Sequence, residues 1–140
     1  MDVKVMRRGF LNRILGRCAT RKPADPGCFE MVEAELVLGL DRAPELAKPG
    51  GALRLEGAGL PFRVLVVHGD DGEFHAFRNK CAHAGRRLDP VPGTKTVQCC
   101  SVGHSTYDYQ GRLLAGSAKS DVYALPVRNR DGKLAVGLEA

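Results

Sequence analysis

The chain has 140 residues, a length that fits a single domain and leaves no room for two cores of ordinary size. Hydrophobic residues make up 44% and charged residues 26% of the sequence, which excludes wholesale disorder. No apolar run approaches the ~20 residues that a transmembrane helix needs, so no transmembrane segment is expected. The 17 glycines and 8 prolines, with no tryptophan, favour a turn-rich β protein.

The net charge of +5 is unevenly distributed along the chain. Residues 1–22 carry seven basic side chains and one acidic one, so the remaining residues carry a net charge of about −1. We therefore expect a basic N-terminal arm over 1–27, partly helical or flexible, and a domain over 28–140. The arm is expected to pack on its domain or to fray, and contact of residues 1–22 with an anionic membrane surface or a partner is the alternative. The domain lacks the basic face of a nucleic-acid-binding protein.

From residue 28 onward the sequence predicts short strands separated by turn signals. Strands are expected over residues 29–37, 52–56, 62–68, 73–78, 96–100, 106–109, 112–115, 123–128 and 133–138, with a loop or helical turn over 43–47. Turns recur every 8–12 residues or so, which is typical of an all-β sandwich or small barrel. We therefore predict an antiparallel all-β fold.

Cysteine and histidine cluster in two short segments that each follow a predicted strand. The first segment is Cys81-Ala82-His83, and the second runs from Cys99-Cys100 to His104. Thiolates and imidazoles so close together indicate a metal site at one tip of the fold. Adjacent strand residues face opposite sides, so only one of Cys99 and Cys100 can point at it. Five cysteines, two of them adjacent, and no expected secretory signal favour a reducing compartment, the cytoplasm.

The run from Phe74 to Gly85 resembles the first half of the Rieske [2Fe–2S] motif, and Cys100 opens a segment that resembles the second half. Ser105, Tyr107 and Asp108 all stand in that family's register. The likeness extends over roughly residues 28–138. It implies a [2Fe–2S] cluster in which two cysteines bind one iron and two histidines bind the other. The ligands implied are Cys81, His83, Cys100 and His104.

The second segment departs from the family pattern at one point. Gly103 stands where the family has histidine, and His104 stands where the family has glycine. Three outcomes are open: the loop shifts so that His104 reaches the iron, Cys99 or an outside group supplies the fourth ligand, or no cluster binds. Glycine permits backbone angles that other residues avoid, so Gly103 favours the first outcome.

The resemblance also implies residues that tune the cluster and a covering loop. Ser105 and Tyr107 match the family's serine and tyrosine, which donate hydrogen bonds to a bridging sulfide and to a cysteine sulfur and so raise the reduction potential. The family's proline-containing covering loop corresponds to Gly116-Ser117-Ala118, which has no proline.

The function that this resemblance implies is one-electron transfer by a Rieske-type ferredoxin, not an enzyme, acting with a reductase or an oxygenase-type enzyme. One alternative is a Rieske-fold small subunit or binding module with a modified or absent cluster, which the order of Gly103 and His104 favours. Another is a structural zinc site using the same residues. His68 and His75 stand in predicted strands and are expected to be structural, and Cys18 and Cys28 are given no role.

Overall fold

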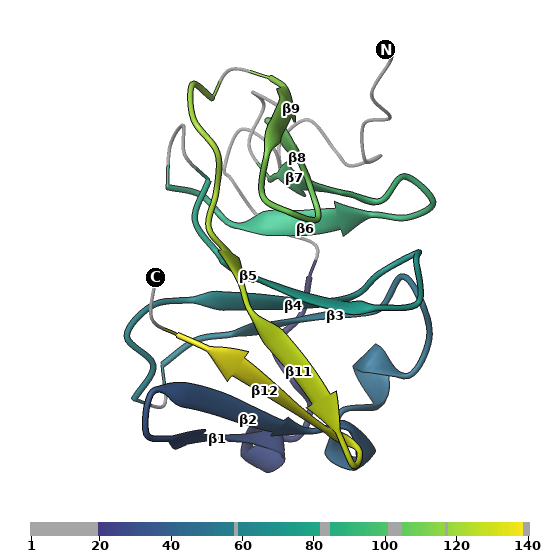
Figure 1. The fold of residues 1–140 in the computed structure, drawn as a ribbon, viewed down its shortest axis with the longest axis vertical. Coiled ribbons are helices and arrows are strands. Elements are labelled where there is room, and N and C mark those ends of the chain that lie inside the picture. Colours follow the sequence, from purple (N-terminus) through teal and green to yellow (C-terminus); the bar gives the residue numbers. More distant parts are fainter. Residues whose placement is uncertain (1–19, 58, 82–84, 101–104, 117, 139–140) are drawn as a thin grey trace.

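The computed structural model describes residues 20–57, 59–81, 85–100, 105–116 and 118–138. In these residues the strands form three antiparallel four-stranded sheets that follow one another along the long axis of the molecule (Figure 1). The lower sheet contains, in order, β1 (Phe29–Val32), β2 (Glu35–Gly39), β12 (Lys133–Gly137) and β11 (Val127–Arg130). The central sheet contains β10 (Ala124–Leu125), β5 (Phe74–Arg78), β4 (Val64–His68) and β3 (Ala52–Leu55). The upper sheet contains β6 (Leu88–Val91), β7 (Thr96–Cys99), β8 (Thr106–Asp108) and β9 (Leu113–Ala115).

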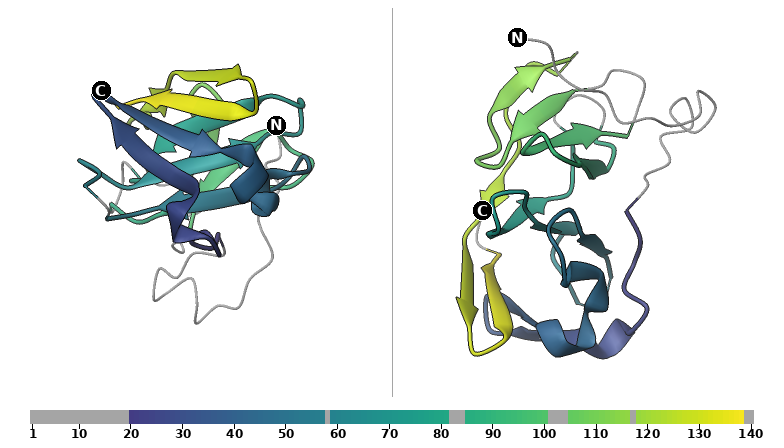
Figure 2. Two further views of the ribbon diagram at one scale, coloured as in Figure 1. Left: turned by 90° about the horizontal axis from the view of Figure 1, so that it is seen from below. Right: turned by 90° about the vertical axis from the view of Figure 1, so that its right-hand side faces the viewer.

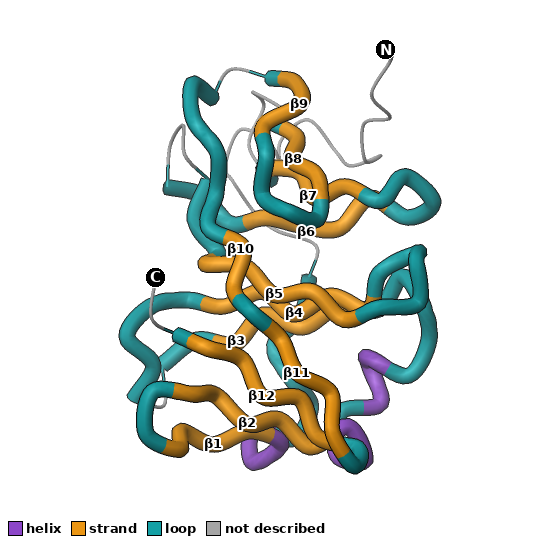
Figure 3. The backbone as a smooth tube through the Cα atoms, in the orientation of Figure 1, coloured by secondary structure: helices purple, strands orange, loops and turns teal. Residues whose placement is uncertain are grey.

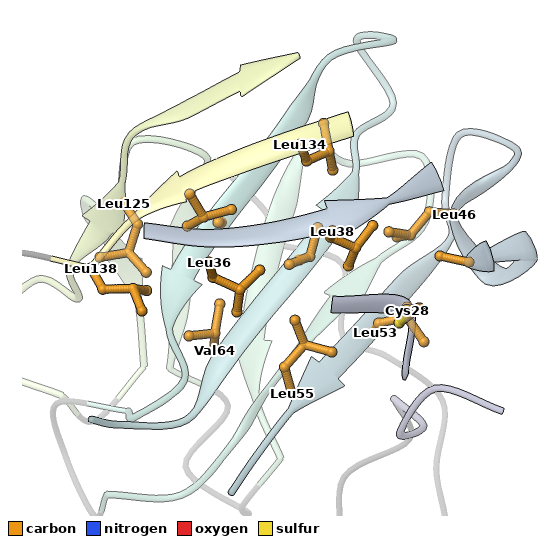
Figure 4. Close-up of a cluster of buried hydrophobic side chains, with 14 residues drawn as sticks. Cys28, Leu36, Leu38, Leu46, Leu53, Leu55, Val64, Leu125, Leu134 and Leu138 are labelled. Carbon is orange, nitrogen blue, oxygen red and sulfur yellow. The ribbon is translucent and has the colours of Figure 1, made fainter. Parts of the chain in front are cut away.

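The central sheet separates two hydrophobic cores. Successive side chains of a strand point to opposite faces. In β4, Val64 and Val66 therefore pack toward the lower sheet, and Leu65 and Val67 pack toward the upper sheet. Figure 4 shows the lower core, where Leu36 and other leucines of two sheets meet. All four apolar residues are buried, which explains why β4 reads as a continuous apolar run.

Short helical turns connect the strands beside the lower sheet (Figure 3). They are η1 (Pro26–Cys28), η2 (Leu40–Arg42) and η3 (Pro44–Leu46), and η3 falls within 43–47, where a loop or helical turn is predicted. None of the helices in the described ranges is long and apolar enough to cross a membrane. The nearly all-β architecture with antiparallel sheets confirms the predicted fold class.

The segment from Thr20 to Pro26 runs along the body in Figure 2 and is tied to it by hydrogen bonds. The backbone N–H and hydroxyl of Thr20 both donate to Oδ1 of Asp89, at 2.8 and 2.6 Å. The N–H of Arg54 donates to the carbonyl of Arg21 at 2.9 Å. The predicted arm helix lies outside the described residues, and the division at residue 28 stays a prediction.

Two of the predicted strands were wrong in detail and one strand was missed, each for a local reason. The predicted strand 29–37 is the hairpin β1–β2, whose turn places Glu33 at φ +56°, a conformation without the usual glycine or asparagine signal. The predicted strand 123–128 is broken at Pro126, because proline has no N–H to donate, and the chain passes there from the central to the lower sheet. Strand β6 was not predicted because it contains Pro90, which is tolerated since β6 lies at a sheet edge.

Candidate metal centre

The two segments with predicted ligands meet on one short stretch of chain, Arg86-Arg87, just before β6. The backbone N–H of Cys81 donates to the carbonyl of Arg86 at 2.7 Å, and that of Cys100 donates to the carbonyl of Arg87 at 3.0 Å. Each cysteine is only 1% exposed. The fold therefore brings Cys81 and Cys100 to consecutive residues of a common support, although nineteen positions separate them in the sequence.

Tyr107 is the aromatic residue whose hydroxyl is hydrogen-bonded to a cysteine of this site. It is fully buried in β8, between Val97 of β7 and Leu113 of β9. Its hydroxyl lies 3.3 Å from Sγ of Cys81, within hydrogen-bonding distance. Tyrosine O–H is a donor and a thiolate sulfur is an acceptor, so a metal-bound Cys81 would receive this bond. A hydrogen bond to a ligand sulfur stabilises the more negative reduced state of a cluster.

Ser105 connects the second segment to the chain that follows β9. Its carbonyl accepts the N–H of Cys99 at 2.8 Å, and its Oγ accepts the N–H of Ala118 at 2.9 Å. A hydroxyl that accepts one hydrogen bond still has its own proton to donate. Ser105 is buried, so this proton needs an acceptor close to the site. The segment predicted to cover the cluster, Gly116–Ala118, is thus attached to Ser105 at its last residue.

The first segment is closed at its base by Arg63 and Asn79, which the sequence analysis did not identify. The Arg63 guanidinium donates from Nε to the carbonyl of Asn79 at 3.0 Å and from Nη2 to the carbonyl of Gly85 at 2.6 Å. The buried Asn79 side chain accepts the N–H of Leu88 at 2.7 Å. One guanidinium and one amide therefore hold both ends of the segment that carries Cys81.

A second anchor holds the support stretch itself. Glu56 receives two hydrogen bonds of 2.7 Å from the Arg87 guanidinium and one of 2.9 Å from Arg54. The hydrogen bonds from Arg87, aided by Arg54, lower the pKa of Glu56 to about 2 against the opposing effect of burial. The carboxylate is thus ionised throughout the neutral range. It fixes Arg87, whose carbonyl holds Cys100.

The buried cysteines differ in what surrounds them. Cys99 ends β7 opposite Leu88 and packs in the upper core with Cys81 and Tyr107, whereas Cys100 is buried outside that core. Adjacent thiols thus face different surroundings, as expected of strand residues. Cys28 lies in the lower core, where burial raises the pKa of its thiol. Cys28 is therefore not part of this site.

The two histidines outside the predicted site have partners within the fold. Nδ1 of His68 lies 2.8 Å from the carbonyl of Leu46, and its ring stacks on Phe74. Nε2 of His75 lies 2.9 Å from Asp71, and its ring stacks on Tyr109. The predicted ligands His83 and His104, together with Gly103 and Cys18, lie outside the described residues. Among the described residues, the predicted metal ligands are Cys81 and Cys100. Both are buried thiols, which suit the cysteine-bound iron of a cluster.

Comparison with known proteins places the chain in a family. The family model for the Rieske [2Fe–2S] domain matches residues 40–126. The oxygenase subunit of glycine betaine monooxygenase is 42% identical over 52 residues in Chromohalobacter salexigens and in Pseudomonas aeruginosa. Each match covers 36% of this chain and only 12% of the relative, so the chain spans a small part of those proteins.

Solved structures share the fold. The ferredoxin of carbazole 1,9a-dioxygenase from Nocardioides aromaticivorans IC177 has a TM-score of 0.58 at 24% identity, covering 72% of this chain and 93% of the ferredoxin. The complex of reduced oxygenase and oxidised ferredoxin in carbazole 1,9a-dioxygenase gives a TM-score of 0.61 at 17% identity, over 77% of this chain and 96% of the matched one. Because the family model spans more than half of the sequence, this chain belongs to the Rieske [2Fe–2S] domain family.

Proposed function

We propose that this protein is a Rieske-type ferredoxin that carries single electrons to or from an oxidoreductase. Cys81 and Cys100 would bind one iron of the [2Fe–2S] cluster, and His83 and His104 the other. When bound, such a cluster accepts and releases one electron. The observation that carries the proposal is the Tyr107 hydroxyl at 3.3 Å from Cys81 Sγ, beside a second buried cysteine held by the same Arg86-Arg87 stretch.

The residues around the thiols would give the site its properties. Tyr107 would donate a hydrogen bond to the Cys81 sulfur, and Ser105 would donate its remaining proton to a bridging sulfide. Both bonds stabilise added negative charge and so raise the reduction potential. Arg63 and Glu56 keep the two cysteine segments in register, which limits the rearrangement of the protein as the charge of the site changes.

The partner that we propose is an oxygenase-type enzyme or its reductase. Support comes from the fold match to a ferredoxin of carbazole 1,9a-dioxygenase, of which this chain covers 93%. It also comes from the similar structure in which an oxidised ferredoxin is complexed with a reduced oxygenase. Electron-transfer encounters between such proteins use small, short-lived interfaces.

A Rieske-fold small subunit with a modified or absent cluster is the second candidate. It is favoured by one specific observation, the order Gly103-His104 where the family has histidine before glycine. The comparison with oxygenase subunits is compatible with either candidate, because the aligned 52 residues are a small part of those proteins.

The discriminating experiment is the visible and electron paramagnetic resonance spectrum of the purified protein, with iron, sulfide and zinc analysis. We expect a red-brown protein whose visible absorption is bleached by dithionite. Its reduced form should give the electron paramagnetic resonance signal of one unpaired electron. Colourless, metal-free protein after anaerobic reconstitution would contradict the proposal in favour of the second candidate. Colourless protein with stoichiometric zinc would contradict it in favour of a structural zinc site.

A further inference from the structure

A pocket of about 690 Å³ opens beside Cys81, on the flank of the candidate metal centre. Its lining includes Arg78, Lys80, Cys81, Gly85, Asp121 and Tyr123. The first four come from the end of β5 and the segment after it, and the others come from the chain just before β10. We refer to it as the Arg78–Tyr123 pocket. A group bound here would lie next to a proposed iron ligand.

The two basic residues of this pocket have no acidic partner in the part of the chain that the structure describes. Arg78 stacks its guanidinium on the Phe62 ring, 5.0 Å from the centroid, and its Nε is buried without a hydrogen-bond partner. Lys80 is exposed, and its side-chain stem passes over Gly85. Arg78 lines the pocket, and an anion that enters the pocket could pair with its guanidinium group.

The single carboxylate of the lining does not neutralise this pair. Oδ1 of Asp121 accepts the backbone N–H of Leu113 at 2.8 Å, so Asp121 is oriented by the chain and not by either base. Two cations and one engaged carboxylate leave the pocket with a net positive charge. Two exposed residues next to the lining in the sequence, Lys119 before Ser120 and Arg86 after Gly85, add further positive charge near it.

Tyr123 gives the pocket an apolar contact surface. It is 60% exposed, one of three large hydrophobic side chains exposed in the described residues, and its carbonyl accepts the N–H of Arg78 at 2.9 Å. Tyrosine and arginine are the residue types that most often dominate protein interfaces. Their neighbourhood beside a basic pocket is typical of a protein-binding surface.

We propose that the Arg78–Tyr123 pocket receives an aspartate or glutamate side chain from an acidic segment of the redox partner protein. The proposal deepens and rests on the proposed function. Arg78 would bind the carboxylate, Lys80 would attract it from solution, and Tyr123 would pack on the adjoining segment. Complementary charge of this kind raises the association rate, and its effect falls with ionic strength.

The test uses full-length holoprotein labelled with 3-fluorotyrosine and a hexaglutamate peptide as the acidic probe. The chain has three tyrosines, and only Tyr123 is exposed, so Tyr123→Phe assigns its fluorine resonance. At low ionic strength we expect hexaglutamate to shift the Tyr123 resonance, hexalysine to leave it unchanged, and added salt to reverse the shift. The buried Tyr107 and Tyr109 resonances report that the fold is intact.

The variants remove the basic pair or a matched pair elsewhere. We expect Arg78→Gln with Lys80→Gln to weaken hexaglutamate binding at least tenfold, and Lys80→Gln alone, at an exposed site, to weaken it severalfold. The control is Arg130→Gln with Lys133→Gln, which removes the same two charges from the exposed pair that faces across β11 and β12. This control should bind hexaglutamate like the parent protein.

The outcomes separate this inference from the proposed function. Two results with red-brown protein would overturn the pocket proposal and leave the electron-carrier proposal intact. One is a Tyr123 resonance that does not shift with hexaglutamate, and the other is unchanged hexaglutamate binding by the double variant. Colourless protein that still binds hexaglutamate through Arg78 and Lys80 would support the pocket and overturn the carrier. A response to phosphatidylglycerol vesicles without one to hexaglutamate would overturn the protein partner in favour of an anionic membrane surface.

Discussion

The hydroxyl of Tyr107 in β8 of the upper sheet lies 3.3 Å from Sγ of Cys81, which follows β5 of the central sheet and is 26 positions away in the sequence. Removing this hydroxyl should destabilise the reduced form of the proposed cluster. We expect Tyr107→Phe to lower the reduction potential by an amount equivalent to about 1 kcal/mol, roughly 40 mV for one electron. A spectroscopic redox titration measures it.

The matched control is Tyr109→Phe. This variant also loses the hydroxyl of a buried tyrosine. That hydroxyl donates to Oδ2 of Asp70 at 3.3 Å and accepts the backbone N–H of Asp70 at 3.0 Å, so its hydrogen-bond partner is Asp70 and not a cysteine sulfur. Its potential should match the parent protein. An unchanged potential in Tyr107→Phe, or equal shifts in both variants, would show that Tyr107 does not act on the cysteine sulfur.

The role of Arg63 can be tested through cluster lifetime. Arg63→Met removes the two hydrogen bonds that hold the carbonyls of Asn79 and Gly85 and leaves these acceptors without their donor. We expect the free energy of unfolding to fall by about 1–3 kcal/mol and the visible absorption to decay faster in the presence of a chelator. Arg112→Met, which removes an exposed pair with Asp108, should change neither. Equal decay rates in the two variants would contradict the anchoring role.

Glu56 makes a specific prediction for acid stability. Its pKa is about 2 in the folded protein against an ordinary value of 4.5, so the folded state favours the ionised form. The resulting stabilisation is fully present above pH 4.5 and is lost as the pH falls toward 2, in total about 3 kcal/mol. Urea denaturation between pH 7 and 2 should show this loss in the parent protein. The Glu56→Gln variant should be less stable at pH 7, and its free energy of unfolding should change less between pH 7 and 2. Parallel plots of unfolding free energy against pH for the two proteins would refute the assignment.

The ligand set is tested by four variants of the second segment. We expect His104→Ala and Cys100→Ser to give colourless protein after reconstitution, and Cys99→Ser to keep its colour. Exchanging Gly103 and His104 to the family order should increase iron retention if the usual register holds. Iron and sulfide analysis with visible spectra measures all four. Full colour in His104→Ala together with loss in Cys99→Ser would assign the fourth ligand to Cys99.

The N-terminal boundary is tested by two truncations. Deleting residues 1–19 should leave the melting temperature of the body unchanged. Deleting 1–22 also removes the two hydrogen bonds of Thr20 to Asp89, a carboxylate only 1% exposed, and the bond between Arg21 and Arg54. Such a buried carboxylate loses stabilisation with each donor, so this truncation should lower the melting temperature by several degrees. Identical melting curves would place the domain boundary beyond residue 22.

The parts of the site that the sequence predicts are those encoded in neighbouring residues. Cys81 and Cys100 are recognisable because ligand type and spacing occur within a few positions, and Tyr107 falls seven residues after Cys100. Both cysteines follow a strand, β5 or β7, and both donate their N–H groups to the Arg86-Arg87 stretch. The same locality explains the strands that were predicted: β4 and β5 each contain their own apolar pattern and are separated by an obvious turn.

The supporting residues lack such a local signal. Arg63 reaches Gly85 across 22 positions, and Glu56 reaches Arg87 across 31. Their roles depend on sheet pairing, because Glu56 directly follows β3 and Arg63 directly precedes β4. Strand β6 escaped prediction because Pro90 weakens its pattern while its edge position tolerates it. Nonlocal pairing, and not side-chain chemistry, set the limit of the sequence analysis.

The support of both cysteines by consecutive residues has a consequence for how the protein acquires iron. The N–H groups of Cys81 and Cys100 bond to Arg86 and Arg87 through the polypeptide alone. Ordering a residue costs about 1–2 kcal/mol of backbone entropy, and here that ordering belongs to folding. Iron would thus meet two cysteines whose backbones folding has already fixed to neighbouring carbonyls, so less ordering would remain to be done when the metal binds.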